Sequence, residues 1–206
     1  MIVFRTEGAR MSFADGTVVA LPDVAIETGA RVAVLGANGT GKTTLLRVLA
    51  FLETPAGGFS AAVPAAEIGF VAQRPFLLRG TVTANLMLAA RRLPRSSRMG
   101  AVADALARVG ASHLAGRARV ALSTGELQRV AIARALVGRP RVLLLDEDVA
   151  PLDADGVRFL CETLAALDDV TVIAAAPGPD GVPFEAGAHV VRLDGARRLH
   201  SVPSRS

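Results

Sequence analysis

The chain has 206 residues, which fit one sizeable domain or a core with one inserted subdomain. Its composition is 51% hydrophobic but only 4% aromatic, so the core must consist mainly of Ala, Val and Leu, as in α/β proteins with buried parallel strands. The net charge of +4 fits a solvated exterior, with contact to nucleic acid or an anionic membrane as alternatives. The single cysteine excludes a disulfide framework within one chain.

The N-terminal segment, to about Thr28, is expected to form antiparallel strands. Its opening residues, MIVFRTEGAR, lack the basic and apolar blocks of a secretory signal. No apolar run approaches the roughly 20 residues that a membrane-spanning helix needs. We therefore expect a cytoplasmic protein in which any role at a membrane depends on a partner.

Residues 32–50 predict a short apolar strand, a glycine-rich turn and an amphipathic helix, in the order that a phosphate-binding loop requires. The glycines let the backbone curl round an anion, and the loop opens onto a helix N-terminus that favours negative charge. Lys42, the only lysine in the chain, is expected to reach the β- and γ-phosphates, and the Thr43 hydroxyl to bind Mg²⁺. The predicted nucleotide-binding residues here are Gly36, Ala37, Asn38, Gly39, Thr40, Gly41, Lys42, Thr43 and Thr44.

This loop alone indicates only a nucleotide. GTPases usually read guanine with an Asn-Lys-x-Asp motif, which a chain with one lysine cannot also contain. Small-molecule kinases stay open at this point.

Residues 121–136 predict a helix that Ser123 caps. The Ser123 hydroxyl and the Gly125 amide would present donors at a positive helix end. Such a second anion site is useful only if another subunit brings a phosphate to it. An ordinary capped helix is the alternative.

Residues 141–147 predict a buried strand that ends in two acids, Asp146 and Glu147. A carboxylate at this place beside a phosphate loop can hold Mg²⁺ through water, and we assign that role to Asp146. The next residue points to the opposite side, so Glu147 is the candidate catalytic base that orients or deprotonates the attacking water. The pair favours hydrolysis over transfer to an acceptor, with solvated strand-end acids as the alternative.

The stretch Leu122-Ser-Thr-Gly-Glu126 resembles the signature of the ABC ATPase family, usually Leu-Ser-Gly-Gly-Gln, and the helix that follows is typical of that family. In the family, two cassettes stack head to tail and each signature closes over the ATP of its partner. The resemblance therefore implies that Ser123 and Gly125 contact ATP bound by a second cassette. Thr124 departs from the family's Gly, and its β-branched side chain limits close approach of the backbone.

Further matches extend the resemblance over nearly the whole chain. Residues 70–86 are similar to the family's Q-loop and the start of its helical subdomain. This resemblance implies that Gln73 is a catalytic residue and a metal-site residue that contacts Mg²⁺ or the lytic water. Residues 150–153 fall where the D-loop belongs. Phe13, ahead of a possible turn at residues 15–16, is the candidate aromatic that stacks on adenine, with a core position as the alternative.

One group that the family normally has is missing. The strand at residues 170–176 should lead to a switch histidine, but Ala176 and Pro177 stand there, and neither side chain can hydrogen-bond. His189 falls later and is interpreted as structural. We therefore expect slow hydrolysis or reliance on a different polar group.

Together these patterns predict an α/β fold with a P-loop NTPase core, a mainly parallel sheet, an N-terminal antiparallel β subdomain and an inserted α-helical subdomain. Residues 1–206 would form one ABC ATPase domain, with 1–73 and 123–206 as the nucleotide-binding core and 74–122 as the helical subdomain. Within it, Val102, Leu106 and Val109 share one helical face. Cys161, among apolar helical residues, is expected in the core.

The expected function is that of an ATP-binding and ATP-hydrolysing transporter subunit with Mg²⁺ at its site. It would be peripheral on the inner face of the cell membrane through transmembrane partner subunits and would pair with a second cassette, in the simplest case an identical copy. The loops at residues 50–55 and 73–79 are similar to the corresponding stretches in the ATP-binding subunits of importers of tungstate, molybdate or related oxyanions. A non-transport ABC ATPase acting on DNA or the ribosome is the alternative, although we expect no nucleic acid partner. A small-molecule kinase would instead transfer phosphate to an acceptor.

Overall fold

The computed structural model describes residues 1–146, 152, 154–184, 188–193 and 198–200. Five parallel strands form the central sheet, in the order β10-β5-β9-β8-β7. Their bounds are β5 Arg31–Leu35, β7 Ile68–Val71, β8 Val142–Asp146, β9 Thr171–Ala176 and β10 His189–Arg192. This parallel order brings the carboxyl ends of all five strands to one edge of the sheet.

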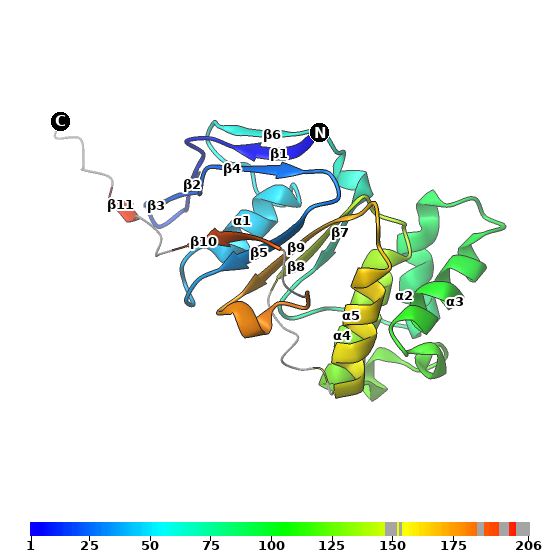
Figure 1. Ribbon diagram of the computed structural model, residues 1–206. Coiled ribbons are helices and arrows are strands. Elements are labelled where there is room, and N and C mark those ends of the chain that lie inside the picture. The colour runs from blue at the N-terminus through cyan, green and yellow to red at the C-terminus, as the bar shows by residue number, and fades with distance from the viewer. Residues whose placement is uncertain (147–151, 153, 185–187, 194–197, 201–206) are drawn as a thin grey trace.

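Two small antiparallel sheets accompany the central one (Figure 1). The first has the order β4-β1-β6 and the second β11-β3-β2. Their bounds are β1 Ile2–Thr6, β2 Arg10–Ser12, β3 Thr17–Ala20, β4 Val24–Glu27, β6 Phe59–Ala61 and β11 Arg198–His200. The antiparallel part is therefore not purely N-terminal, because β6 and β11 join it from later in the chain.

The central sheet is buried on both faces by consecutive apolar residues. In β8, Val142 and Leu144 pack into a core shared with β1, β5 and α1 (Lys42–Leu49), whereas Leu143 and Leu145 pack into a core shared with helices. Because side chains alternate across a strand, a continuous apolar run supplies both cores at once.

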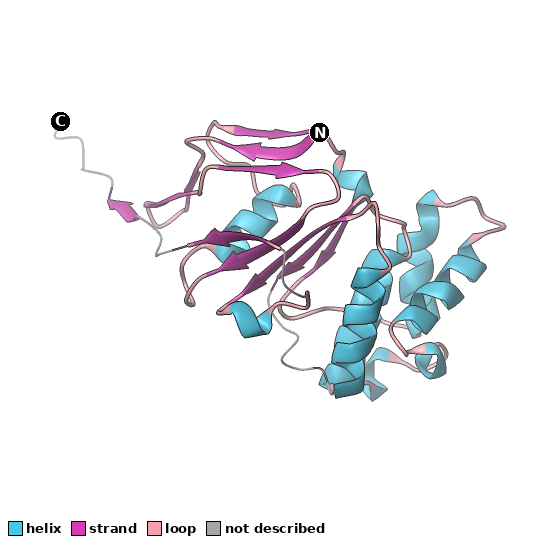
Figure 2. Cartoon of the chain, viewed as in Figure 1, coloured by secondary structure: helices cyan, strands magenta, loops and turns pink. Residues whose placement is uncertain are grey.

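The helices divide between the two faces of the central sheet. Figure 1 shows α1 between the antiparallel strands and the central sheet, and α4 and α5 beyond the opposite face, with α2 and α3 outside them. Figure 2 shows the same division, with most helical segments gathered on one side of the molecule. The bounds are α2 Val82–Ala89, α3 Arg98–Arg108, α4 Thr124–Leu136 and α5 Ala154–Ala165, with short 3₁₀ turns η1 Ala65–Glu67, η2 Ala90–Arg92, η3 Ser112–Leu114, η4 Arg119–Ala121 and η5 Pro179–Gly181.

The predicted α/β architecture is confirmed, and so is the buried helical face formed by Val102, Leu106 and Val109. The core position expected for Cys161 is wrong, because this residue is exposed. In α5, Leu160 and Leu164 lie one turn apart and face the core, and Cys161 is rotated about 100° away from Leu160. Among the described helices, none combines the length and apolar character that crossing a membrane requires.

Arg31 fixes the start of β5, the strand that leads into the glycine-rich loop. Its guanidinium donates hydrogen bonds to the carbonyls of Gly29, Leu164, Leu167 and Val170, at 3.4, 3.0, 2.5 and 2.5 Å. These acceptors belong to the turn before β5, the end of α5 and the segment before β9. One cation therefore satisfies carbonyls from three segments and holds the two neighbouring strands in register.

Candidate nucleotide-binding site

The glycine-rich loop connects β5 to α1, and its shape excludes side chains at particular positions. A Cβ atom at Gly36 would lie 2.6 Å from the Leu193 carbonyl oxygen and 2.7 Å from the Thr40 hydroxyl. Gly39 and Gly41 have φ angles of 81° and 100°, in the left-handed region that favours glycine. Gly41 is the N-cap of α1 and offers no side chain to its first amides. The loop thus presents backbone donors at a helix N-terminus.

Lys42 places a positive charge inside this loop. This residue is only 3% exposed, and its ammonium donates to the carbonyls of Gly36 and Ala37 at 2.8 and 3.1 Å. The Ala37 carbonyl also accepts a hydrogen bond from the Thr40 amide, which closes the turn. An ammonium enclosed by a curled backbone at a helix N-terminus makes a strong anion site.

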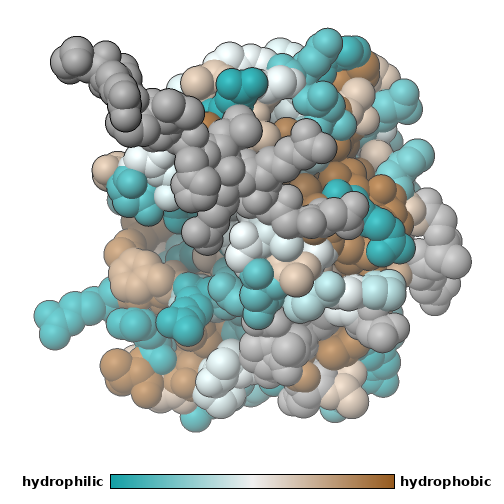
Figure 3. All heavy atoms as spheres, turned by 90° about the vertical axis from the view of Figure 1, so that its left-hand side faces the viewer, coloured by the Kyte–Doolittle hydropathy of each residue, from teal (hydrophilic) through white to brown (hydrophobic). Residues whose placement is uncertain are grey.

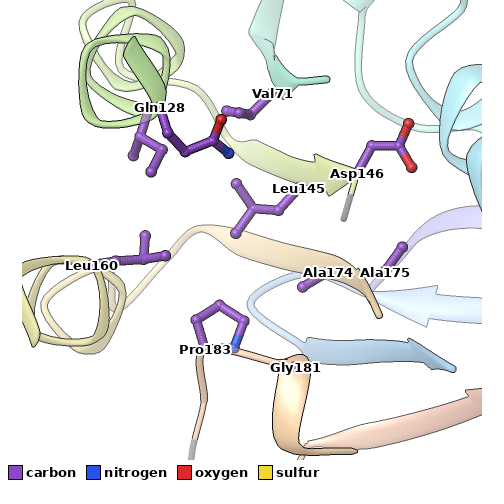
Figure 4. A pocket seen from close by; sticks show the side chains of 10 residues that line it. Val71, Gln128, Leu145, Asp146, Leu160, Ala174, Ala175, Gly181 and Pro183 are labelled. Carbon is purple, nitrogen blue, oxygen red and sulfur yellow. The ribbon is translucent and has the colours of Figure 1, made fainter. Parts of the chain in front are cut away.

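The next residue joins the loop to the central sheet. The Thr43 hydroxyl donates to Oδ1 of Asp146 at 2.9 Å, and Asp146, the last residue of β8, is 3% exposed. Figure 4 shows the Asp146 carboxylate pointing away from the cavity that Leu145 enters. The exposed Thr43 hydroxyl and the buried Asp146 carboxylate are hard oxygen ligands side by side. Mg²⁺ is commonly held by one or two protein oxygens together with phosphates. These residues therefore fit the predicted ion.

A cavity of about 460 Å³ lies over the loop and brings together residues from four parts of the chain. Phe13 reaches it from the turn between β2 and β3, where the Phe13 amide donates to the Thr17 carbonyl and Gly16 has a φ of 80°. Figure 3, viewed from the side of β2 and β3, shows hydrophilic and hydrophobic residues interspersed over the described surface. The cavity is lined by Phe13, Val19, Asn38, Gly39, Gly41, Lys42, Thr43, Thr44 and Gln73.

Several predicted residues follow the carboxyl ends of neighbouring strands. Gln73 comes two residues after β7 and lines the cavity, and Asp146 ends β8. Glu147, the predicted catalytic base, lies outside the described residues, as do residues 150, 151 and 153 of the predicted D-loop. Gly36, Ala37 and Thr40 belong to the glycine-rich loop and fix its shape, but they are not among the residues that line the cavity.

The position of the missing histidine is close to the loop. Pro177 directly follows β9, and the Gly36 amide donates to the carbonyl of Ala176 at 3.3 Å. His189 instead pairs with Val32 at the amino end of β5, the edge of the sheet opposite the loop. His189 therefore lies at the wrong end of its strand to replace the missing group.

The predicted signature lies at the N-terminus of α4. Ser123 caps this helix through a capping box, in which its hydroxyl accepts from the Glu126 amide at 3.3 Å and the Glu126 carboxylate accepts from the Ser123 amide at 2.8 Å. Ser123 and Thr124 are exposed. Among the described residues that line the cavity over the loop, none comes from this signature, so the structure does not join the two predicted sites within one chain.

Glu126 carries a charge that the sequence analysis did not consider. Its second oxygen accepts from the Arg117 guanidinium at 2.8 Å. The hydrogen bond from the Ser123 amide, the strongest influence, lowers the pKa of Glu126 below its usual value, and the charge of Arg117 acts in the same direction. The capping box therefore holds an ionised carboxylate at neutral pH.

A small cavity links α4 to the carboxyl edge of the sheet. It has about 20 Å³, room for about one water molecule, and Gln128 of α4 lines it together with Leu145, Asp146 and Pro183. Figure 4 shows the Gln128 side chain extending from α4 towards β8. The helix that begins at the signature and the strand that ends in Asp146 thus line the same cavity.

Sequence reasoning missed two parts of this arrangement. Val19 of β3 lines the cavity beside Phe13, and no pattern in the sequence distinguishes it from Val18, the other valine of that strand. Glu126 could have been found, because Ser followed three residues later by Glu is the spacing of a capping box. Its partner Arg117 comes from an irregular segment and had no such signal.

Comparisons with known proteins agree with this geometry. The family described as "ABC transporter" matches residues 22–150. Among curated relatives, the aliphatic sulfonates import ATP-binding protein SsuB 1 of Nocardia farcinica is 47% identical over 71% of this chain and 59% of the relative. The molybdenum import ATP-binding protein ModC of Aromatoleum aromaticum is 38% identical over 88% of this chain and 53% of the relative. The zinc import ATP-binding protein ZnuC of Ruegeria pomeroyi is 38% identical over 75% and 59%.

This chain therefore spans between half and three fifths of the length of these curated relatives. A solved structure, cbiO1 from Clostridium perfringens, described as part of the ABC transporter complex cbiONQ, superposes with a TM-score of 0.74 at 31% identity and covers 88% of this chain and 81% of that one. The family match covers more than half of the chain, and the fold agrees with it. The chain belongs to the ABC transporter family.

Proposed function

We propose that this chain is the ATP-binding and ATP-hydrolysing subunit of an ABC importer, and that it energises transport through separate membrane subunits. The observation that carries the proposal is the joined set of Lys42, Thr43 and Asp146. A buried ammonium lies inside the glycine-rich loop, and the adjacent hydroxyl is hydrogen-bonded at 2.9 Å to a buried carboxylate. An anion site beside an oxygen-ligand site is what a metal-bound triphosphate requires.

Each predicted site residue of the loop and of the surrounding segments has a separate role in the proposed function. Lys42 binds the β- and γ-phosphates, Thr43 and Asp146 hold Mg²⁺, and Gln73 positions the attacking water. Mg²⁺, when bound, neutralises charge on the phosphate oxygens. Phe13 stacks on adenine from the antiparallel sheet, and Glu147 is the proposed base. The reaction joins a water oxygen to the γ-phosphorus and releases ADP and phosphate.

The exposed signature supports a partner that is a second copy of the chain or a close relative. Ser123 and Gly125 lie at a helix N-terminus whose donors favour an anion, yet the phosphate cavity of the same chain does not include them. In the proposed dimer each chain binds ATP with its own loop and covers the ATP of the other with its signature. Neither site is complete in one chain alone.

The proposals for membrane attachment and for cargo are based on the relatives. The chain would act at the inner face of the cell membrane, with residues 74–122 as a helical subdomain next to the membrane subunits. The relatives' names specify sulfonates, molybdenum and zinc, so an oxyanion is one candidate cargo class among several. Nothing among the described residues contacts cargo in this proposal.

The test is ATP hydrolysis by the purified chain. We expect phosphate release that needs Mg²⁺ and stops with EDTA, and we expect Lys42→Ala to abolish ATP binding as well as turnover. Asp146→Asn keeps the size of the side chain but removes its charge, so it should lose turnover while the fold, followed by circular dichroism, is kept. Phosphate release that persists in Lys42→Ala would contradict the proposal, as would transfer of phosphate to an added alcohol.

A further inference from the structure

The N-terminus of α4 is tied to a segment that lies outside the signature. Residues 115–119 run antiparallel to residues 80–83, which lead into the first turn of α2. The Val82 amide donates to the Arg117 carbonyl at 3.0 Å, the Thr83 amide to the Ala115 carbonyl at 2.9 Å, and the Arg119 amide to the Gly80 carbonyl at 3.3 Å. Thr81 and Ala118 form an isolated bridge within the same pairing. The backbone of Arg117 is therefore fixed relative to α2.

The side chain of Arg117 reaches from this fixed segment to α4. Its guanidinium lies 2.8 Å from one oxygen of Glu126, whose other oxygen accepts from the Ser123 amide at 2.8 Å. The Glu126 side chain is 17% exposed and that of Arg117 47%. One carboxylate thus links the cap of α4, through Arg117, to the start of α2.

The charge of the Glu126 carboxylate bears on whether the N-terminus of α4 can receive a phosphate. An ionised carboxylate beside a helix N-terminus opposes the approach of a triphosphate, since like charges repel strongly where solvent is excluded. The signature of the family normally ends in neutral Gln, whereas this chain has Glu126. A cation paired with that carboxylate removes the repulsion and also keeps the carboxylate in the capping box.

We propose that Arg117 is a positioning residue for the signature, which neutralises and holds Glu126 so that the N-terminus of α4 can receive the phosphates of a partner's ATP. This inference rests on the proposed function. Arg117 need not touch ATP itself, because it acts through Glu126. Its loss should therefore affect assembly and turnover without affecting the loop that binds ATP first.

The test compares Arg117→Gln, Glu126→Gln and the double variant in the full chain. Arg117→Gln should lower kcat about tenfold, because an unpaired carboxylate then faces the incoming phosphates. Its affinity for ATP in the monomer should stay as in the wild type, since the cavity over the loop is unchanged. Glu126→Gln keeps an acceptor for the Ser123 amide without the charge, and in the Arg117→Gln background it should restore kcat to within about twofold of Glu126→Gln alone.

Arg108→Gln is the matched control, because Arg108 also pairs with a carboxylate on an exposed surface, Asp104 at 3.1 Å, but away from the signature. This control should keep wild-type kcat. A double variant that stays as slow as Arg117→Gln, or an Arg117→Gln variant with wild-type kcat, would overturn the inference. Equal thermal unfolding midpoints in the variants would separate the effect from a general loss of stability.

Hydrogen exchange distinguishes failure of this inference from failure of the proposed function. Without ATP, the amides of Ser123 and Glu126 should exchange faster in Arg117→Gln than in the wild type. If the wild type releases no phosphate, the proposed function fails and the positioning role for ATP fails with it. If the wild type is active but exchange and turnover are unchanged by Arg117→Gln, only the positioning role is wrong.

Discussion

Two helix N-termini in this molecule face anions in the proposed function, and they are built differently. The first, at α1, begins with Gly41, which has no side-chain cap, and it adds Lys42 and the Thr43–Asp146 hydrogen bond. The second, at α4, is closed by its own capping box and has a carboxylate in place of an ammonium. In the proposed function, this difference means that one chain binds the triphosphate at α1, whereas α4 only complements a site that a partner's loop already occupies.

The largest effect is expected at α1, where the proposed function has Mg²⁺ bound. Thr43→Val removes the hydroxyl that contacts Asp146 but keeps the branched shape, so turnover should fall about 100-fold through loss of electrostatic stabilisation. Thr43→Ser keeps the hydroxyl and is the matched control, with turnover within a few-fold of wild type. The measurement is steady-state phosphate release over a range of Mg²⁺ concentrations. Equal activity of the Val and Ser variants would show that the hydroxyl has no role.

A smaller effect on turnover is expected from a change at α4. Mixing this variant with a variant of the α1 site then tests whether the two helices belong to different halves of one site. Ser123→Arg blocks the exposed cap, so it should lower turnover about tenfold or more, as loss of transition-state contacts does, while nucleotide affinity of the single chain stays unchanged. Mixed with Lys42→Ala chains, it should regain activity, because a mixed dimer contains one site with an intact loop and an intact signature. Absence of any recovery would break the division of roles between the two helices.

The smallest effect concerns the edge of the α1 site. Pro177→His introduces a hydrogen-bonding side chain directly after β9, beside the start of the loop, and should raise kcat a few-fold, within the range of general acid–base or orienting groups. Pro177→Ala is the control for loss of the proline ring and should not raise kcat. An unchanged rate in Pro177→His would mean that another group already fills this role.

The features that sequence reasoning predicted are local in the chain. The strand, turn and helix of residues 32–50 follow one another directly, and apolar runs such as that of β8 indicate a sheet buried on both faces. The α/β architecture could therefore be predicted. The capping role of Ser123 was also local, because it depends only on the first turn of α4.

The features that could not be predicted from the sequence depend on contacts between distant segments of the chain. Val19 joins Phe13 at the cavity only because the antiparallel strands lie over the loop, and β11 pairs with β3 from the far end of the chain. The pairing of Arg117 with Glu126 depends on how residues 115–119 lie against residues 80–83. A helical period cannot indicate such contacts. The expectation for Cys161 was wrong for a different reason, because it relied on apolar neighbours in sequence, whereas the helical period turns Cys161 away from the face of Leu160 and Leu164.

Because Lys42 is buried in the glycine-rich loop, its reactivity towards an amine-directed reagent can report on the state of that loop. Every other Lys or Arg position is Arg, so only one side chain in the sequence is a primary amine. Lys42 is 3% exposed, and its amine donates to two carbonyls at the N-terminus of α1. Apart from the N-terminal α-amine, which lies in a separate peptide, an amine-directed label can therefore react only at Lys42. The extent of labelling of the Lys42 peptide, read by mass spectrometry, measures how open the glycine-rich loop is without any engineered probe.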